Sequence, residues 1–208
     1  MIQSKDRSRY FGGSDAKWVT GKWSSDSFKN WWLVKIGIFK DDLETKAMKV
    51  GNAYEHKILD FYVPECEKDG QIVLEDIKLR VNYDGVKGNH IYEVKTYSAE
   101  EFKVSKAYRE QAQVEMFAWN EAHWGEESKL SFLAYKVEKQ AEYLDYFLPI
   151  DPDKLTEIEV EYDEDYIEEW LLNAEHLCKC LEEGIMPNEN DRPNRDKPKG
   201  KKKSTGKR

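Results

Sequence analysis

Two acidic residues and one lysine, Asp84, Glu93 and Lys95, follow one another at a spacing that could support phosphodiester hydrolysis. Carboxylates that converge repel each other unless a cation lies between them, and Mg²⁺ prefers such oxygen ligands. A bound Mg²⁺ would polarise a phosphoryl oxygen and lower the pKa of a bound water. A lysine beside it would orient or deprotonate that water, or stabilise developing negative charge. If they meet in space, these residues predict a metal-dependent hydrolytic site.

The segments that carry these residues read as two strands, 71–83 and 90–97, joined by a turn at 87–89. Because side chains alternate along a strand, each strand has one apolar face. The apolar residues are Ile77, Leu79, Val81, Tyr83, Tyr92 and Val94. Burying them on a common side places Asp84, Glu93 and Lys95 together on the other side. The alternative is an ordinary solvated hairpin face with a Glu–Lys pair.

Two predicted helices each carry a polar residue within an apolar stripe. Glu55 lies in the stripe of helix 46–62, and Gln111 in that of helix 104–123. A buried carboxylate needs an ion partner or a metal, and a buried amide needs hydrogen bonds. Two ordinary readings stay open: Glu55 at the edge of its stripe with its carboxylate in water, and Gln111 capping a nearby backbone group.

The remaining elements complete the predicted fold. Further helices are expected over 26–38 and 163–183, and further strands over 130–137 and 143–149. The order predicts an α/β fold, in which helices flank a mixed sheet. Residues 1–186 form the expected domain, and residues 187–208 form a basic tail that we expect to be disordered. The tryptophans at 18, 23, 31 and 32 fit core packing better than base stacking.

The charge is divided unevenly along the 208 residues. From Glu189 onward there are nine basic and three acidic residues, whereas residues 1–188 hold 24 basic and 38 acidic residues, a net charge of −14. Such a body is not a general nucleic-acid binder, so any contact with nucleic acid must be focused. No apolar run is long enough for a membrane span and no secretory signal is visible, so a cytoplasmic protein is expected.

Several other site classes find no support. The three cysteines cannot supply a four-thiolate zinc or iron–sulfur site. The four histidines lack the paired spacing of zinc hydrolases, and no P-loop is present. Near the N-terminus, Gly12-Gly13-Ser14 could offer N–H groups and a hydroxyl to a phosphate, although such a turn can equally be a plain loop.

The ordered set of segments resembles the PD-(D/E)XK nuclease superfamily, and within it the YqaJ-like viral recombinases and phage lambda-type exonucleases. Four segments match in order: Gly12 to Ala16, Gly51 to Glu55, Asp84-Gly85 with Glu93-Val94-Lys95, and Tyr108 with Gln111 and Gln113. Asn82-Tyr83 replaces the proline-containing start of the motif. The match spans residues 7 to about 120 and implies a restriction-endonuclease-like core.

The resemblance also implies a role for individual residues. Asp84, Glu93 and the Val94 carbonyl would ligate Mg²⁺, or Mn²⁺ as a substitute, with Glu55 near the metal. Lys95 would be the catalytic lysine, and Gln111 would position it or the attacked phosphate. Ser14, with Arg7 or Arg9, would hold the 5′ phosphate of the DNA. Tyr108 and Gln113 would have secondary roles.

The implied function is Mg²⁺-dependent exonuclease action on linear double-stranded DNA, 5′ to 3′, in phage-type recombination. A single-strand annealing protein and a ring-shaped homotrimer are the implied partners, in the cytoplasm of a bacterial or phage-infected cell. Two alternatives stay open: a structure-directed endonuclease with the same core, and a non-enzymatic acidic interaction module. The first would nick closed circular DNA, and the second would show no response to metal.

Overall fold

The computed structural model describes residues 8–40, 45–124, 127–138 and 145–193. Within them a five-stranded sheet has the order β1-β2-β3-β4-β5. The strands are β1 (Glu67–Leu74), β2 (Leu79–Lys87), β3 (His90–Tyr97), β4 (Lys129–Lys136) and β5 (Leu155–Val160). β3 and β4 are parallel, and the other three neighbouring pairs are antiparallel. The sheet is therefore mixed, and the predicted fold class is confirmed.

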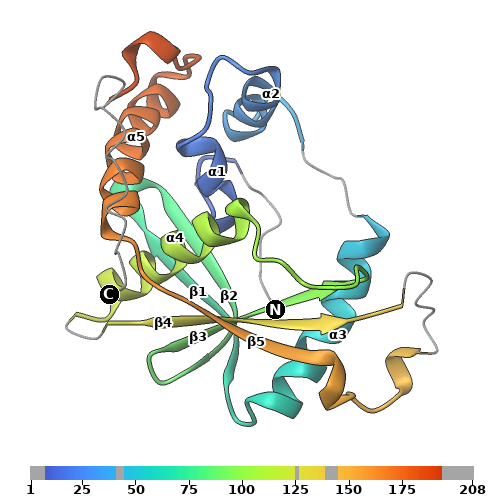
Figure 1. Ribbon diagram of the computed structural model, residues 1–208. Coiled ribbons are helices and arrows are strands. Elements are labelled where there is room, and N and C mark those ends of the chain that lie inside the picture. The colour runs from blue at the N-terminus through green and yellow to red at the C-terminus, as the bar shows by residue number, and fades with distance from the viewer. Residues whose placement is uncertain (1–7, 41–44, 125–126, 139–144, 194–208) are drawn as a thin grey trace, which may run out of the picture.

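Helices cover both faces of this sheet (Figure 1). They are α1 (Ala16–Val19), α2 (Asp26–Lys35), α3 (Lys46–Tyr62), α4 (Lys106–Ala122) and α5 (Glu164–Glu183). α3 lies on one face, whereas α4 lies on the other face with α1 and α5 outside it. Since β3 and β4 are parallel, the chain must cross over between them, and α4 forms that crossover. The crossover places the middle of α4 above β3.

Two buried clusters correspond to the two faces. The larger joins α1, α2, α4 and α5 to the sheet, and Trp23, Trp32, Phe132 and Trp170 are among its members. The smaller lies under α3 and contains Ile58, Leu59, Val94 and Leu133. Trp18 and Trp31 pack against the larger cluster, so the expected packing role of the N-terminal tryptophans is confirmed.

Local signals set the ends of the helices. Thr45 caps α3 by accepting a hydrogen bond from the Met48 N–H, and Ser105 does the same for α4 from Tyr108. α5 ends at Gly184, which has a φ of 67° and adopts the left-handed conformation that glycine tolerates. None of the helices in the described ranges is long and apolar enough to cross a membrane.

Two of the predicted strands are wrong. The segment 71–83 is not one strand, because a turn at Glu75–Ile77, followed by Lys78 with a φ of 50°, divides it into β1 and β2. The expected strand at 143–149 is also absent from its described part, where Asp145–Phe147 form a 3-10 turn. The fifth strand comes later, at Leu155–Val160. It is a short edge strand in which no residue is fully buried, and three of its six residues are polar.

The expected apolar face shared by Val81, Tyr83, Tyr92 and Val94 is likewise wrong. Val81 and Tyr83 lie in the larger cluster, whereas Val94 lies in the smaller one and Tyr92 packs against it. The Tyr83 hydroxyl bonds to the Glu115 carbonyl on α4, yet a Cβ on Gly85 would approach Leu59 on α3. Residues two apart in a regular strand face the same side, so β2 changes face at Asp84. Asp69, opposite Asp84 in register, has a φ of 56°.

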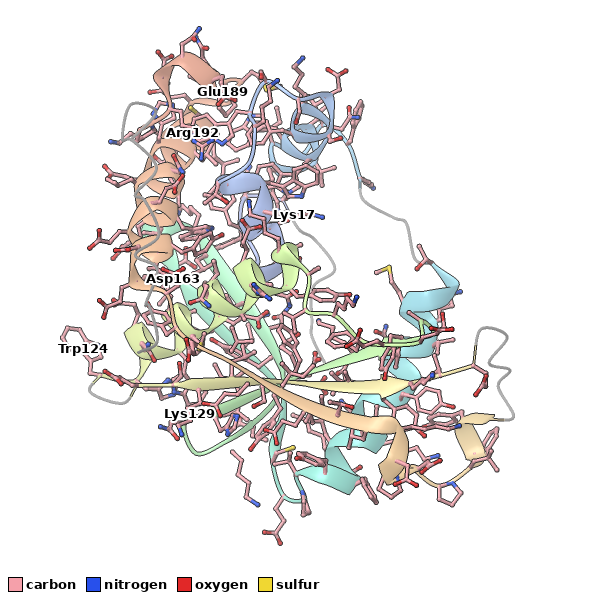
Figure 2. All side chains as sticks on the ribbon, viewed as in Figure 1. Lys17, Trp124, Lys129, Asp163, Glu189 and Arg192 are labelled. Atoms are coloured by element: carbon pink, nitrogen blue, oxygen red, sulfur yellow. The ribbon has the colours of Figure 1, made fainter. Side chains whose placement is uncertain are left out.

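The chain after α5 packs back onto the N-terminal helices (Figure 2). The Arg192 guanidinium donates to the Thr20 and Gly21 carbonyls at 2.8 Å each and to Glu169 at 3.1 Å. Glu189 accepts a hydrogen bond from the Ser24 N–H at 3.0 Å. The folded domain therefore extends at least to Arg192, beyond the expected boundary at residue 186. Most of the basic tail, 194–208, lies outside the described residues.

Candidate active site

The Asp84 side chain is fixed to β3 by a hydrogen bond that takes the place of a backbone hydrogen bond between β2 and β3. β2 and β3 pair by their backbones from Gly85–Tyr92 to Lys87–His90. Just beyond this ladder, Asp84 Oδ2 accepts a hydrogen bond from the Val94 N–H at 2.8 Å. The change of face at Asp84 thus turns its carboxylate toward β3, beside Glu93 and Lys95. The three residues converge as expected, although by a route that strict alternation does not predict.

Glu93 is the centre of a buried polar network. Its side chain is 3% exposed, and its Oε2 accepts from the Lys95 ammonium at 2.9 Å. The same oxygen accepts from the Gln111 amide at 3.1 Å. α4 supplies Gln111 because it crosses the sheet above β3. Gln111 is therefore not a backbone cap, and it contacts the acid that pairs with the lysine.

A third buried acid, Glu115, was not among the candidates from the sequence. It follows Gln111 by one helical turn and is 1% exposed. Its Oε1 accepts from the Gln111 amide at 2.7 Å, whereas its Oε2 is buried without a hydrogen-bond partner in the described part of the chain. The signal was present, since an acid four residues after Gln111 falls in the same apolar stripe.

The acids are held where ionisation is unfavourable. The pKa of Asp84 is raised well above its usual value by burial first, and then by the charges of Glu93 and Glu55. Burial and Glu93 also raise the pKa of Glu115 well above the usual range. The pKa of Glu55 is raised for the same two reasons. Four acids thus compete for one lysine, and oxygen donors in such excess suit a hard cation.

Lys95 itself stays protonated. Burial lowers its pKa, but the charges of Glu93, Asp84 and Glu115 outweigh burial, so the net pKa lies above the ordinary value. Its ammonium also lies 5.2 Å from the ring centroid of Tyr108, within the range of a cation–π contact. Tyr108 is therefore at the site. A charged Lys95 is suited to stabilising negative charge rather than to accepting a proton.

Glu55 lies on α3, on the far side of the acids from α4. Its carboxylate is part of a group with His56 and Asp69, whose ligand atoms lie within 4.8 Å of one another. His56 Nε2 is 3.2 Å from Asp69 Oδ1 and 3.9 Å from Glu55 Oε1. Glu55 interacts electrostatically with both this group and Glu93. The donors are mostly carboxylates, which suit a hard divalent cation.

Gln113 does not belong to the site. Its amide donates to the Glu161 carbonyl at 2.9 Å and accepts from the Asp163 N–H at 2.7 Å. It therefore holds the chain that enters α5. Two residues apart on a helix point in different directions, which explains why Gln111 and Gln113 separate. The expected secondary role of Gln113 at the site is replaced by a structural one.

A pocket of about 120 Å³ adjoins the acids on the side of the N-terminal turn. Ser14 lines it, together with Lys35, Arg80, Gln111 and Glu115. Arg9 is exposed and is not among the lining residues, and Arg7 lies outside the described residues. The cations beside Ser14 are thus Lys35 and Arg80. Sequence spacing could not find them, because α2 and β2 bring them in from distant positions.

Asp15 gives the N-terminal turn its shape. Its Oδ2 accepts from the Gly12 N–H at 2.8 Å and lies 2.6 Å from the Lys35 ammonium. Its Oδ1 accepts from the Trp31 indole at 2.8 Å. Lys35, which is 2% exposed, also donates to the Tyr10 carbonyl. The turn is therefore an ordered structure and not a plain loop.

Comparison with solved structures finds similar folds among exonucleases. An alkaline exonuclease from Laribacter hongkongensis, LHK-Exo, matches with a TM-score of 0.63 and 18% identity, over 86% of this chain and 91% of that one. The same enzyme in complex with dAMP gives 0.62 and 17%, over 85% and 89%. A phage-related exonuclease from Haemophilus somnus 129PT gives 0.59 and 14%, over 84% and 96%.

Comparisons of sequence add nothing to this result. No family model matches the chain, and no curated protein matches it. At identities of 18% and below, the similarity to solved structures establishes the fold. The chain therefore has the fold of these exonucleases over more than four fifths of its length, with a buried cluster of acids and one lysine at its centre.

Proposed function

We propose that this protein is a divalent-metal-dependent DNA exonuclease of the PD-(D/E)XK superfamily, in its YqaJ-like and lambda-type branch. One observation carries the proposal: Asp84, Glu93 and Lys95 converge in a buried, acid-rich site, in a fold shared with exonucleases. The raised pKa values of Asp84 and Glu55 support a cation there, because a bound cation would let both acids ionise.

The proposed roles follow from chemistry and position. Asp84, Glu93 and the Val94 carbonyl would hold Mg²⁺, with Glu55 nearby, and the bound ion would activate a water and polarise the phosphate. Lys95 stays charged and stabilises the negative charge that develops on the phosphate. Gln111 keeps Glu93 and the attacked group in position.

The pocket beside the acids supports recognition of a DNA end. Ser14 and Arg80 bring a hydroxyl and a cation to its lining, which suits a terminal 5′ phosphate, whereas Lys35 is held in its pair with Asp15. A phosphate held there would place the following phosphodiester near the acids, so that cleavage proceeds from the 5′ end. The acidic body agrees with such focused binding and not with binding along the duplex.

The function is tested on linear duplex DNA labelled at either end, with a closed circular duplex alongside. We expect Mg²⁺-dependent release of nucleotides from 5′-phosphorylated ends by the wild type and none by Asp84→Asn. The asparagine carbonyl oxygen can still accept the Val94 hydrogen bond, so the variant should remain folded. Nicking of the circular duplex would instead support the endonuclease. If the wild-type protein leaves all DNA intact and shows no metal-induced thermal shift, the result would support the interaction module.

The resemblance also has implications for the oligomeric state, the partner protein and the cellular location. It implies a ring-shaped homotrimer, a single-strand annealing protein as partner, and action in the cytoplasm during phage-type recombination. These implications are predictions that sedimentation and pull-down experiments can test.

A further inference from the structure

Glu115 is an acid in a place that favours an apolar residue. Its neighbours on α4, Val114, Met116 and Phe117, are all buried. A buried carboxylate oxygen without a hydrogen-bond partner is unfavourable, and Glu115 Oε2 is such an oxygen among the described residues. A leucine would avoid that penalty. What the carboxylate offers in return is its charge near Lys95 and the hydrogen bond that it accepts from Gln111 at 2.7 Å.

That contact decides how the Gln111 amide is turned. Nε2 of Gln111 donates to Glu115 Oε1 and to Glu93 Oε2, so both of its hydrogens point to acids. The carbonyl end of the amide must then point away from the two acids. If Glu93 binds a cation, its oxygens are drawn to the ion. Glu115 is then the anchor that still keeps the amide from turning over.

Glu115 also meets the N-terminal turn. A Cβ on Gly13 would lie 2.6 Å from Glu115 Oε1 and 3.1 Å from its Cγ, so the Gly13 backbone packs directly on the carboxylate. Gly13, Ser14, Gln111 and Glu115 line the same pocket. One carboxylate thus lies between the turn that faces the pocket and the amide that faces Glu93.

We infer that Glu115 is a positioning residue: it holds the Gln111 amide in one orientation and couples the Gly12–Asp15 turn to the acids of the cleavage centre. This inference rests on the proposed nuclease function and deepens it. Glu115 acts through Gln111 and does not touch the reacting phosphate. The contribution of Glu115 to catalysis therefore exists only when Gln111 is present.

A double-mutant cycle tests this dependence. We measure kcat and KM on 5′-phosphorylated linear duplex for the wild type, Glu115→Leu, Gln111→Leu and the double variant. Glu115→Leu should lower kcat about 100-fold, as expected for a displaced catalytic-site group, with KM nearly unchanged. In the Gln111→Leu background it should have no further effect on kcat. Glu115→Gln, whose carbonyl can still accept from Gln111, should restore kcat to within about threefold of the wild type.

Gln113→Leu is the matched control, because it removes a neighbouring amide of α4 that bonds only to the segment before α5. Gln113→Leu should lower the melting temperature. It should change kcat by the same small factor in the wild type and in the Gln111→Leu variant. The inference is overturned if the losses from Glu115→Leu and Gln111→Leu multiply, or if Glu115→Leu lowers only the melting temperature. A wild type as inactive as Asp84→Asn would overturn the proposed function as well, so the two failures are distinguishable.

Discussion

Among the described residues, the Lys35–Asp15 and Lys95–Glu93 pairs are both largely withdrawn from solvent, but they differ in how far their hydrogen bonds and charges are satisfied. Lys35 and Asp15 approach to 2.6 Å, and Lys95 and Glu93 to 2.9 Å. Around Asp15 the groups are balanced, since the Gly12 N–H and the Trp31 indole satisfy the remaining acceptors and Lys35 also donates to a backbone carbonyl. Around Glu93, by contrast, Asp84, Glu55 and Glu115 add acids without adding cations.

This difference distinguishes a structural ion pair, Lys35–Asp15, from one that belongs to the candidate site, Lys95–Glu93. A buried ion pair whose hydrogen bonds are complete has no use for a ligand, and breaking it leaves an uncompensated charge. A pair with surplus acids is unfavourable until a cation arrives, and perturbed pKa values of this kind are typical of functional sites. Matched changes at the two lysines should therefore fail in opposite ways.

The largest effect is expected from Lys95→Met. We predict that it lowers the rate of nucleotide release about 1,000-fold, because it removes a preorganised charge at the phosphate. It should also lower the melting temperature of the metal-free protein, and Mn²⁺ should reverse that change by neutralising Glu93. Rate assays and thermal shifts with and without Mn²⁺ check both parts. A melting temperature that stays low in Mn²⁺ would contradict a cation site here.

Lys35→Met should act mainly on stability. It leaves the buried Asp15 carboxylate without its cation, which destabilises by about 3–5 kcal/mol and lowers the melting temperature by roughly 10 °C. Mn²⁺ should not reverse the loss, in contrast with Lys95→Met. The two variants are compared in one calorimetric series. Equal responses to Mn²⁺ would remove the distinction between the pairs.

The sequence predicted much of the frame that positions these pairs. Helix 46–62 and strand 90–97 were predicted with the bounds that α3 and β3 have. Strong apolar periodicity and clear caps explain this success. β5 was missed because it is a six-residue edge strand with no fully buried residue, and β1 was merged with β2 because no glycine or proline marks the turn at Glu75–Ile77.

The sequence predicted which residues meet at the site, but not the strand geometry that brings them together. Asp84, Glu93, Lys95 and Gln111 meet, although a regular strand alternation would not have produced the observed faces. The change of face at Asp84 depends on the opposing strand, where Asp69 takes a left-handed conformation. Lys35 and Arg80 reach the pocket only through tertiary packing, and no sequence pattern joins them to Ser14.

The surplus acids should give the metal-free protein an unusual pH response. The raised pKa values of Asp84, Glu115 and Glu55 mean that the folded state binds more protons than the unfolded state above about pH 4. Their contribution to stability is therefore present at low pH and is lost as the pH rises through the raised values. We predict a higher melting temperature at pH 5.5 than at pH 7.5, which calorimetry at the two pH values checks.

The control for this prediction is the double variant Asp84→Asn, Glu115→Gln, which lacks two of the three groups. Its melting temperature should depend less on pH over the same interval. Saturating Mn²⁺ should likewise reduce the dependence in the wild type, because a bound cation favours the ionised acids. A wild type that melts at a higher temperature at pH 7.5 than at pH 5.5 would reverse the sign worked out here.

The smallest effect concerns the pocket. Arg80 lines it from β2, and its guanidinium lies 5.2 Å from the Tyr10 ring. We predict that Arg80→Gln lowers the preference for 5′-phosphorylated over dephosphorylated ends about fivefold, because one charge-assisted contact to phosphate is lost. The rate on dephosphorylated ends should stay unchanged. Parallel digestions of the two substrates give the ratio, and an unaltered ratio would place recognition of the phosphate elsewhere.

The hydrogen bond between the Asp84 carboxylate and the Val94 N–H makes one side chain a member of both the sheet and the proposed catalytic centre. In the native structure the pairing of β2 with β3 and the placement of the Asp84 carboxylate therefore depend on each other. A chain in which this hairpin is out of register would not bring Asp84 beside Glu93, so the proposed cation ligands would not assemble. Binding of the proposed cation would therefore depend on the correct pairing of these two strands.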